Sequence, residues 1–322
     1  MAHSGSIDKI SLLQSRIEQA IRVCELYFGQ DLPQKQIAQR LAMSTASVCR
    51  LLRYARQEGL VKFTISPPLN RGDISDLERD LEEFGIHKII VAGKTVNSVA
   101  EATARYFEDS NSSGSTVVLD GGWTVSCFVD SLTPGMFERM TLVPICADPP
   151  SYAVAAQDSV SRLALKYPEK VTCAKQPHLS SKLLAPLHKK IQRRARHANF
   201  IVLGVGPWEK GFTAYEFAKC LGLQPRSLHA SYPSVVGLCG YCPLDSEGSL
   251  IRIRELENKM PRALTFLDIQ RMSKSSCCQV VIAAASERKI AVLLAAIKAR
   301  LCNTLIVDEA LGSALVKTIR RS

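Results

Sequence analysis

The sequence lacks any long apolar segment. No stretch approaches the roughly 18 consecutive apolar residues that a membrane-spanning helix requires, so we expect no membrane partner. The first ten residues are polar, include Asp8, and lack the apolar core of a signal peptide. In a chain without an export signal, the eleven cysteines are better explained as reduced thiols than as a disulfide framework. We therefore expect a cytoplasmic protein.

Length and composition indicate an ordinary globular chain. At roughly 150 residues per domain, its 322 residues predict two domains, or one large domain with an appendage. Apolar residues make up 46% and charged residues 22%, which excludes wholesale disorder. Lys and Arg number 41 against 30 Asp and Glu, giving a formal net charge of +11. An excess of this size is typical of a protein with a polyanionic partner if the cations share one surface.

The N-terminal part reads as a small helical domain, residues 1–66. Apolar residues recur at helical spacing over 11–28, and a second, short helix begins at Pro33. Ser44 is a suitable N-cap for a third helix, which is rich in arginine. A β-rich run follows at 60–65, where two prolines stop it.

Segment 34–52 resembles a helix-turn-helix, with the small Ala38 where the two helices cross and Ala42 at the turn position that usually carries glycine. The third helix would lie in the major groove of DNA. Arg50 is the best candidate for a bidentate contact to guanine, whereas Arg53 suits a phosphate. The alternative is a three-helix interaction module with merely solvated cations. The predicted DNA-binding residues are Lys35, Ser44, Thr45, Ala46, Ser47, Cys49, Arg50 and Arg53.

From residue 67 to 322 the pattern changes to short apolar strands alternating with helices. This alternation predicts an α/β domain with a mainly parallel, doubly wound sheet covered by helices on both faces. The expected strands are 88–92, 116–119, 141–145, 171–174, 200–205, 234–238, 279–283 and 304–307.

Two glycine-bearing turns directly follow expected strands, at Gly121–Gly122 and at Gly204–Gly206. Glycines after a strand let backbone N–H groups approach an anion, and open parallel sheets bind ligands at the carboxyl ends of their strands. Either turn alone can equally be a tight connection. Tryptophans 123 and 208 lie beside the two turns, where they can stack on a ligand or simply pack.

A third candidate turn is 285–289, where an apolar strand meets a helix. There Ser286 could cap the helix while Lys289 or Arg288 neutralises a phosphate. The predicted effector-binding residues are Gly121, Gly122, Trp123, Thr124, Gly204, Gly206, Ser286 and Lys289.

The order of these features resembles the SorC family of bacterial transcriptional regulators over almost the whole chain. The matching pieces are the helix-turn-helix and the segments 58–61, 122–124, 204–206, 240–248 and 307–310. The resemblance implies an N-terminal DNA-binding domain and a larger sugar-phosphate-isomerase-like domain that senses a sugar phosphate and does not catalyse. It also implies a homodimer or homotetramer on double-stranded operator DNA.

The sequence departs from the family pattern in the expected pocket. The Gly122-Trp123-Thr124 turn lacks a second glycine and an arginine. Ala285-Ser286 replaces a pair of glycines, and Gly237 stands where an aspartate is expected. The lining of the pocket therefore differs, and a pocket that binds nothing is an alternative.

Three further alternatives stay open. A sugar-phosphate isomerase or deaminase with an appended helical domain needs a carboxylate base, for which Asp120, Asp148 and Glu216 are scattered candidates. Cys239 and Cys242 form a CxxC motif, which could be a redox pair or half of a metal site but is better explained as buried thiols.

Residues 188–197 form the densest basic run outside the N-terminal domain. We expect it to be a solvated helix face, with a second DNA contact or a subunit contact as the alternative.

The sequence thus predicts a sequence-specific DNA-binding transcriptional regulator, not an enzyme, controlled by a small phosphorylated metabolite such as a sugar phosphate. It calls for no cofactor and no metal.

Overall fold

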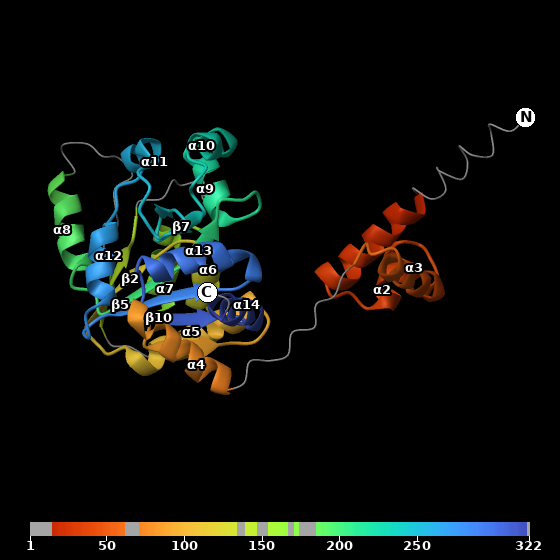
Figure 1. Cartoon of the computed structure of the whole chain (residues 1–322), viewed down its shortest axis with the longest axis horizontal. Coiled ribbons are helices and arrows are strands. Elements are labelled where there is room, and N and C mark those ends of the chain that lie inside the picture. Colours follow the sequence, from red (N-terminus) through yellow and green to blue (C-terminus); the bar gives the residue numbers. More distant parts are fainter. Residues whose placement is uncertain are drawn as a thin grey trace, which may run out of the picture. The chain divides into compact units, whose positions relative to one another are not determined.

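A computed structural model of the chain describes residues 15–61, 71–133, 139–146, 154–166, 171–173 and 185–320. The chain divides into two compact units, Met1–Ser66 and Pro67–Ser322, and each is described by itself. Figure 1 shows both units and labels several of their helices and strands. The strand expected at 60–65 falls mostly in 62–70, outside the described residues. Among the described helices, none has both the length and the apolar character needed to cross a bilayer.

The smaller unit is helical. Residues 15–24 are α-helical and continue into a π-helical turn, η1 (Glu25–Gly29), which precedes α2 (Gln34–Arg40) and α3 (Thr45–Gln57). These helices bury one apolar cluster, as the helical spacing of the apolar residues predicts. Its members are Ala20, Val23, Cys24, Leu26, Ile37, Ala38, Val48, Leu51, Leu52 and Ala55.

The turn between α2 and α3 is held by local hydrogen bonds. Ala42 takes a left-handed conformation (φ +50°), and the N–H of Met43 donates to the carbonyl of Ala38 over 2.9 Å. This is the bond of a helix C-cap that normally ends in glycine. Ser44 then caps α3, because its Oγ accepts the N–H of Ser47 at 3.1 Å. The expected cap at Ser44 is confirmed.

The larger unit is built on a seven-stranded, fully parallel sheet. Its strand order is β1-β10-β9-β5-β2-β3-β4. The chain therefore runs outward from β2 to β4 and returns on the other side of β2. The strands are β1 (Lys88–Val91), β2 (Ser115–Leu119), β3 (Met140–Pro144), β4 (Val171–Cys173), β5 (Phe200–Leu203), β9 (Gln279–Ala284) and β10 (Thr304–Val307).

Helices cover both faces of this sheet, as the sequence predicted. Alternate strand residues enter two different apolar clusters: in β2, Val117 and Leu119 belong to one cluster and Val118 to the other. The first cluster is closed by α5 (Val96–Ser110), α6 (Trp123–Ser131) and α7 (Ala156–Lys166). The second is closed by α4 (Arg71–Leu81), α8 (Ala185–Ala195), α12 (Phe266–Ser273), α13 (Ile290–Lys298) and α14 (Glu309–Ile319). Because the two clusters bury the strands on both faces of the sheet, the sequences of the strands are almost continuously apolar.

The helices and helical turns of the larger unit are α4 (Arg71–Leu81), η2 (Glu82–Phe84), α5 (Val96–Ser110), α6 (Trp123–Ser131), α7 (Ala156–Lys166), α8 (Ala185–Ala195), α9 (Thr213–Cys220), α10 (Pro225–Ser231), α11 (Arg254–Lys259), α12 (Phe266–Ser273), η4 (Glu287–Lys289), α13 (Ile290–Lys298) and α14 (Glu309–Ile319).

A small antiparallel sheet corrects two expectations. It consists of β6 (Val205–Pro207), β7 (Gly237–Cys239) and β8 (Cys242–Leu244). The expected strand 200–205 is thus two strands, because the chain leaves the parallel sheet at Gly204. The expected strand 234–238 does not join the parallel sheet, since its only strand residues lie in β7.

Replacement of Ala42 by glycine should stabilise the smaller unit. Removing a Cβ at positive φ stabilises the folded unit by an amount of the order of 1 kcal/mol. The greater conformational freedom of glycine in the unfolded chain offsets part of this gain. We expect the amides of Leu51 and Leu52 in α3 to exchange with deuterium more slowly by roughly two- to fivefold, measured by native-state hydrogen exchange.

The matched control is Ala46→Gly, the same chemical change at an exposed position inside α3. In a right-handed helix the change costs up to about 1 kcal/mol, so exchange should become faster. Faster exchange in both variants would show that the turn does not depend on the left-handed residue.

Candidate functional site

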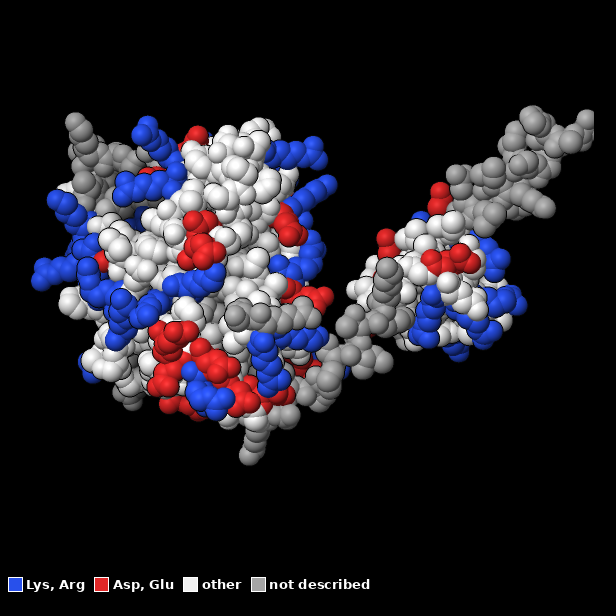
Figure 2. All heavy atoms as spheres, in the orientation of Figure 1, with Lys and Arg blue, Asp and Glu red and all other residues white. Residues whose placement is uncertain are grey.

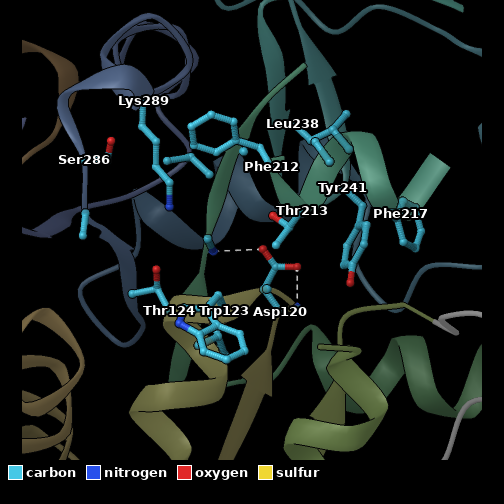
Figure 3. Close-up of a pocket in the computed structure, with 18 of the residues that line it drawn as sticks. Asp120, Trp123, Thr124, Phe212, Thr213, Phe217, Leu238, Tyr241, Ser286 and Lys289 are labelled. Atoms are coloured by element: carbon cyan, nitrogen blue, oxygen red, sulfur yellow. Dashed lines mark hydrogen bonds between the residues drawn. The ribbon is translucent and has the colours of Figure 1, made fainter. Parts of the chain in front are cut away.

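A cavity of about 290 Å³ opens at the carboxyl ends of three neighbouring strands of the parallel sheet. The turns that follow β2, β5 and β9 form its floor, and the small sheet with the start of α9 forms one wall. This edge is where open parallel sheets bind ligands, close to the point where the order of the strands reverses. Figure 3 shows the side chains that converge there.

Asp120 joins two of these turns. Its Oδ1 accepts the N–H of Gly121 at 2.8 Å and its Oδ2 accepts the N–H of Gly204 at 2.9 Å. The side chain is 4% exposed, so both bonds form away from bulk water. A buried carboxylate is stable only when its oxygens are hydrogen-bonded. The Asp120 carboxylate therefore holds the β2 and β5 turns at a fixed separation (Figure 3).

Glycine is required at the β2 turn for two different reasons. A Cβ on Gly121 would collide with the hydroxyl of Tyr241 and lie 2.9 Å from the carbonyl oxygen of Val154. Gly122 has φ +107°, a conformation that side chains rarely adopt. It is also the N-cap of α6, without a side-chain cap. The helix therefore begins at the cavity with its backbone N–H groups directed toward it.

The structure brings all of the predicted effector-binding residues to this one cavity, where each of them contributes to the lining. They are Gly121, Gly122, Trp123, Thr124, Gly204, Gly206, Ser286 and Lys289. The three turn segments lie far apart in the sequence and meet because the carboxyl ends of parallel strands share one edge of the sheet.

Lys289 extends into the cavity from the β9 side, and its ammonium group faces the hydroxyl of Thr124 across the opening (Figure 3). Burial lowers the pKa of Lys289 to about 8, and the nearby carboxylate of Asp308 opposes this shift. Asp308 is itself occupied, since it accepts the N–H groups of Ser286 and Leu311, both at 3.0 Å. Among the described residues that line the cavity, Lys289 is the only Lys or Arg.

Ser286 corrects an expectation. It precedes the 3-10 turn η4, but its hydroxyl caps no N–H group, and its φ of +93° is that of a glycine position. Its backbone N–H is instead held by Asp308. Arg288 also differs from the expectation, because it is not part of the cavity lining: it lies over the ring of Phe212 at 4.7 Å and pairs with Glu209.

Sequence analysis missed the wall of the cavity. Phe212 and Thr213 come from the start of α9, whereas Leu238 and Tyr241 come from the small antiparallel sheet. Tyr241 has a positive φ (+58°) and forms a two-residue hairpin turn with Gly240. In the sequence, Gly240 is the only signal of this turn. No periodicity in such short strands places them beside the parallel sheet.

The two tryptophans have different roles. Trp123 lines the cavity and is 62% exposed, so its indole is available at the mouth. Trp208 does not line it: the side chain is buried and its Nε1 donates to the carbonyl of Pro225 at 3.3 Å. Stacking on a ligand thus remains an option only for Trp123.

Cys239 and Cys242 face each other across the hairpin of β7 and β8, and both are fully buried. Burial raises the pKa of both thiols, and Arg262 donates a hydrogen bond to the sulfur of Cys242 at 3.0 Å. A reactive thiol needs a lowered pKa and access to solvent, so this pair fits the explanation of buried thiols better than a redox pair. Within the described part of the chain, no three His, Cys, Asp or Glu side chains are grouped to hold a metal.

The carboxylates considered for catalysis are differently placed. Asp120 holds backbone N–H groups, as above, and Glu216 pairs with Lys219 at 2.9 Å on an exposed part of α9, outside the cavity lining. Asp148 lies outside the described residues. Among the described residues that line the cavity, no second carboxylate accompanies Asp120.

The smaller unit carries a second candidate site on the outer face of α3. Seven of the eight predicted DNA-binding residues are exposed, and Ser47 is half-buried. Ser47 also receives a hydrogen bond from Arg50 at 3.2 Å, which extends that guanidinium along the start of the helix. The sequence of α3 contains no Asp or Glu. Lys35 stands apart from the others, on α2.

Comparison with known proteins identifies a family model that matches the larger unit. Residues 72–317 match the family model described as "Putative sugar-binding domain". The chain is 27% identical over 134 residues to the deoxyribonucleoside regulator of Bacillus subtilis and 25% identical over 138 residues to the sorbitol operon regulator of Klebsiella pneumoniae. These matches cover 39% and 40% of this chain, and 42% and 43% of the two relatives' length, so they span under half of each relative.

Solved structures show the same fold over more of the chain. The full-length sorbitol operon regulator SorC from Klebsiella pneumoniae matches with a TM-score of 0.63 at 20% identity, covering 93% of this chain and 99% of that one. A DeoR family transcriptional regulator from Listeria monocytogenes matches with a TM-score of 0.61 at 16% identity, covering 75% and 99%. The family model covers more than half of the chain, so the chain belongs to the "Putative sugar-binding domain" family.

Proposed function

We propose that this chain is a DNA-binding transcriptional regulator whose larger unit binds a small phosphorylated metabolite, of the sugar phosphate class. The observation that carries the proposal is the convergence of three strand-end turns and Lys289 on one cavity. The names of the relatives support it, since both are regulators, one of deoxyribonucleosides and one of a sorbitol operon.

The smaller unit supports DNA binding through α3. Its exposed residues form one continuous face, because Thr45, Cys49, Arg50 and Arg53 follow one another at helical spacing opposite the buried residues. A recognition helix presents such a face to the major groove, with its first residues near the bases. Without a carboxylate on α3, nothing in the helix repels the phosphates.

The cavity supports an anionic ligand. The start of α6 offers backbone N–H groups at the positive end of a helix, while Lys289 supplies one positive charge. Thr124 and Thr213 add hydroxyl groups, and Trp123 offers an apolar surface at the mouth. A phosphate toward Lys289 with a small body against Trp123 uses all of these groups.

Regulation would follow from linkage between the two sites. A ligand shifts a conformational equilibrium only through its different affinities for the two states, and the effect on DNA affinity is reciprocal. Helix-turn-helix proteins usually bind two half-sites about one helical turn apart, so we propose that the chain acts as a homodimer or homotetramer on operator DNA. The enzyme alternative is not favoured, because Asp120 already serves the backbone and Glu216 lies outside the cavity lining.

Substitutions on α3 should separate base recognition from phosphate contact. Arg50→Ala should lower the affinity for the chain's own promoter DNA by about 1–3 kcal/mol and relax base preference. Arg53→Ala should weaken binding to all sequences alike and reduce the salt dependence. Fluorescence anisotropy with promoter and scrambled duplexes tests this. Promoter binding unchanged in both variants would remove α3 from the DNA interface.

Ligand binding is tested by a thermal-shift screen with free and phosphorylated sugars. A ligand at 100 times its dissociation constant should stabilise the protein by about 2.7 kcal/mol. Loss of a hydrogen-bonded charge costs about 1.5–3 kcal/mol, so Lys289→Gln should weaken a phosphorylated ligand roughly tenfold or more. Lys317→Gln on α14, an exposed position outside the cavity lining, is the matched control.

The affinity for the phosphorylated ligand should also depend on pH. Below pH 8 Lys289 is an ammonium and affinity should be constant; as pH rises through its pKa of about 8, affinity should fall toward about tenfold per pH unit. The phosphate stays a dianion over this range, because its second pKa is about 6. Titration calorimetry between pH 7 and pH 9.5 measures the trend, and a profile in Lys289→Gln that still falls at pH 8 would contradict the assignment.

A further inference from the structure

The outer face of α8 is basic from Lys189 to Arg194, after the exposed Pro186 and Leu187 of its first turn. Ile191 and Ala195 are buried against the sheet, and the opposite half of the helix is exposed. The sequence of α8 contains no Asp or Glu. At helical spacing the exposed cations form two adjacent rows that together cover half of the helix surface. They are Lys189, Lys190, Arg193, Arg194 and, in the turn that follows, Arg196.

These charges are largely unneutralised. Arg196 pairs with Asp268 at 3.0 Å, and that carboxylate is buried and also accepts hydrogen bonds from Thr265. For the other four cations on this face of α8, no ion pair occurs among the described residues. The residues just before the helix, 174–184, contain Lys175 and Lys182 in sequence and no carboxylate.

The basic surface continues onto α12. Arg271 and Lys274 are exposed there, and Asp268 pairs with both Arg196, at 3.0 Å, and Arg271, at 3.7 Å, which holds α8 against α12. Figure 2 shows Lys and Arg gathered over the side of the larger unit that carries these two helices, while Asp and Glu gather around α4. We call the surface formed by Lys189, Lys190, Arg193, Arg194, Arg196, Arg271 and Lys274 the α8 basic face.

Helix stability explains only part of this face. Arg193 and Arg194 lie in the last turn, where cations interact favourably with the helix dipole. Lys189 and Lys190 lie one turn earlier, each four residues before an arginine. Like charges at this spacing destabilise a helix by about 0.2–0.5 kcal/mol per pair. The arrangement therefore costs stability in the isolated chain, and an anionic partner would remove that cost.

We propose that the α8 basic face binds the phosphate backbone of duplex DNA, as a sequence-independent contact additional to α3. The inference rests on the proposed DNA binding by the smaller unit. An eleven-residue helix is about 16 Å long, and duplex DNA carries about one charge per 1.7 Å of its axis, so each cation of α8 can meet a phosphate. Because phosphate contacts read no bases, the face needs only cations, which is what it offers.

Duplex DNA fits the face better than a second copy of this chain does. The acidic surface that Figure 2 shows on this chain surrounds α4, and the aspartates of α4 are already paired within the chain. Asp76 pairs with Arg79 at 2.9 Å, and Asp73 pairs with Arg320 at 2.8 Å. DNA phosphates carry only mobile counterions, whose release favours binding.

The test uses the full chain and a random-sequence duplex of about 40 base pairs, with affinity followed by anisotropy between about 50 and 200 mM salt. The variant carries glutamine at Lys189, Lys190, Arg193 and Arg194, which keeps helix propensity and polarity. Each lost phosphate contact lowers the slope of log affinity against log salt concentration by about 0.9. We expect a reduction of about two to four in slope.

A matched control carries glutamine at four exposed cations of the same unit that lie outside α8 and α12, so that the net charge is equal. These are Arg105, Lys210, Arg226 and Lys317. Both variants should stay folded, and relief of the like-charge pairs should leave the thermal midpoint of the α8 variant equal to or slightly above that of the parent. Equal slopes for the α8 variant and the control would overturn the inference.

A third variant, Arg50→Ala with Arg53→Ala, separates this inference from the proposed function. If it weakens binding and the α8 substitutions do not, DNA binding belongs to α3 alone and the inference is wrong. If the α8 substitutions weaken binding and the α3 pair does not, the inference holds and the assignment of α3 fails. Light scattering without DNA tests whether a second copy of the chain binds the α8 basic face instead. If the α8 variant forms a smaller oligomer than the parent but keeps the parent's slope of log affinity against log salt concentration, the face is a subunit contact and the inference is wrong.

Discussion

The candidate site depends on one buried carboxylate. Asp120 accepts one N–H from the turn after β2 and one from the turn after β5, and these two turns supply most of the glycines that line the cavity. Asp308 makes the same kind of bridge on the other side, from the turn after β9 to the start of α14. Two carboxylates thus accept the backbone N–H groups of the three turns, which would otherwise need water or a ligand as hydrogen-bond partners.

Most of this architecture could be predicted because buried parallel strands have a simple sequence signature. Seven expected strands lie in the parallel sheet with bounds shifted by a few residues, and the turns after three of them meet in the cavity. The wall contributed by Phe212, Leu238 and Tyr241 could not be predicted. Strands of three residues show no alternation, and the pairing of β6 with β7 depends on contacts between distant segments.

Local rules failed where tertiary structure imposes a conformation. Serine is a common helix N-cap, but the hydroxyl of Ser286 makes no cap hydrogen bond. Instead Asp308 accepts the backbone N–H of Ser286, whose φ is +93°. At Ala42 the same kind of departure was foreseen, because the helix-turn-helix pattern itself names a position of positive φ. Non-glycine residues in this region cost about 1–3 kcal/mol, which the surrounding hydrogen bonds must outweigh.

The burial of Lys289 has a thermodynamic consequence beyond affinity. Its pKa of about 8 leaves part of the population neutral in mildly alkaline solution. An anion bound beside the amine favours its protonated form, so the complex takes up a proton from the buffer as it forms. The heat of association would then vary with the ionisation enthalpy of the buffer. In this way occupancy of the cavity is coupled to the pH of the solution through a single side chain.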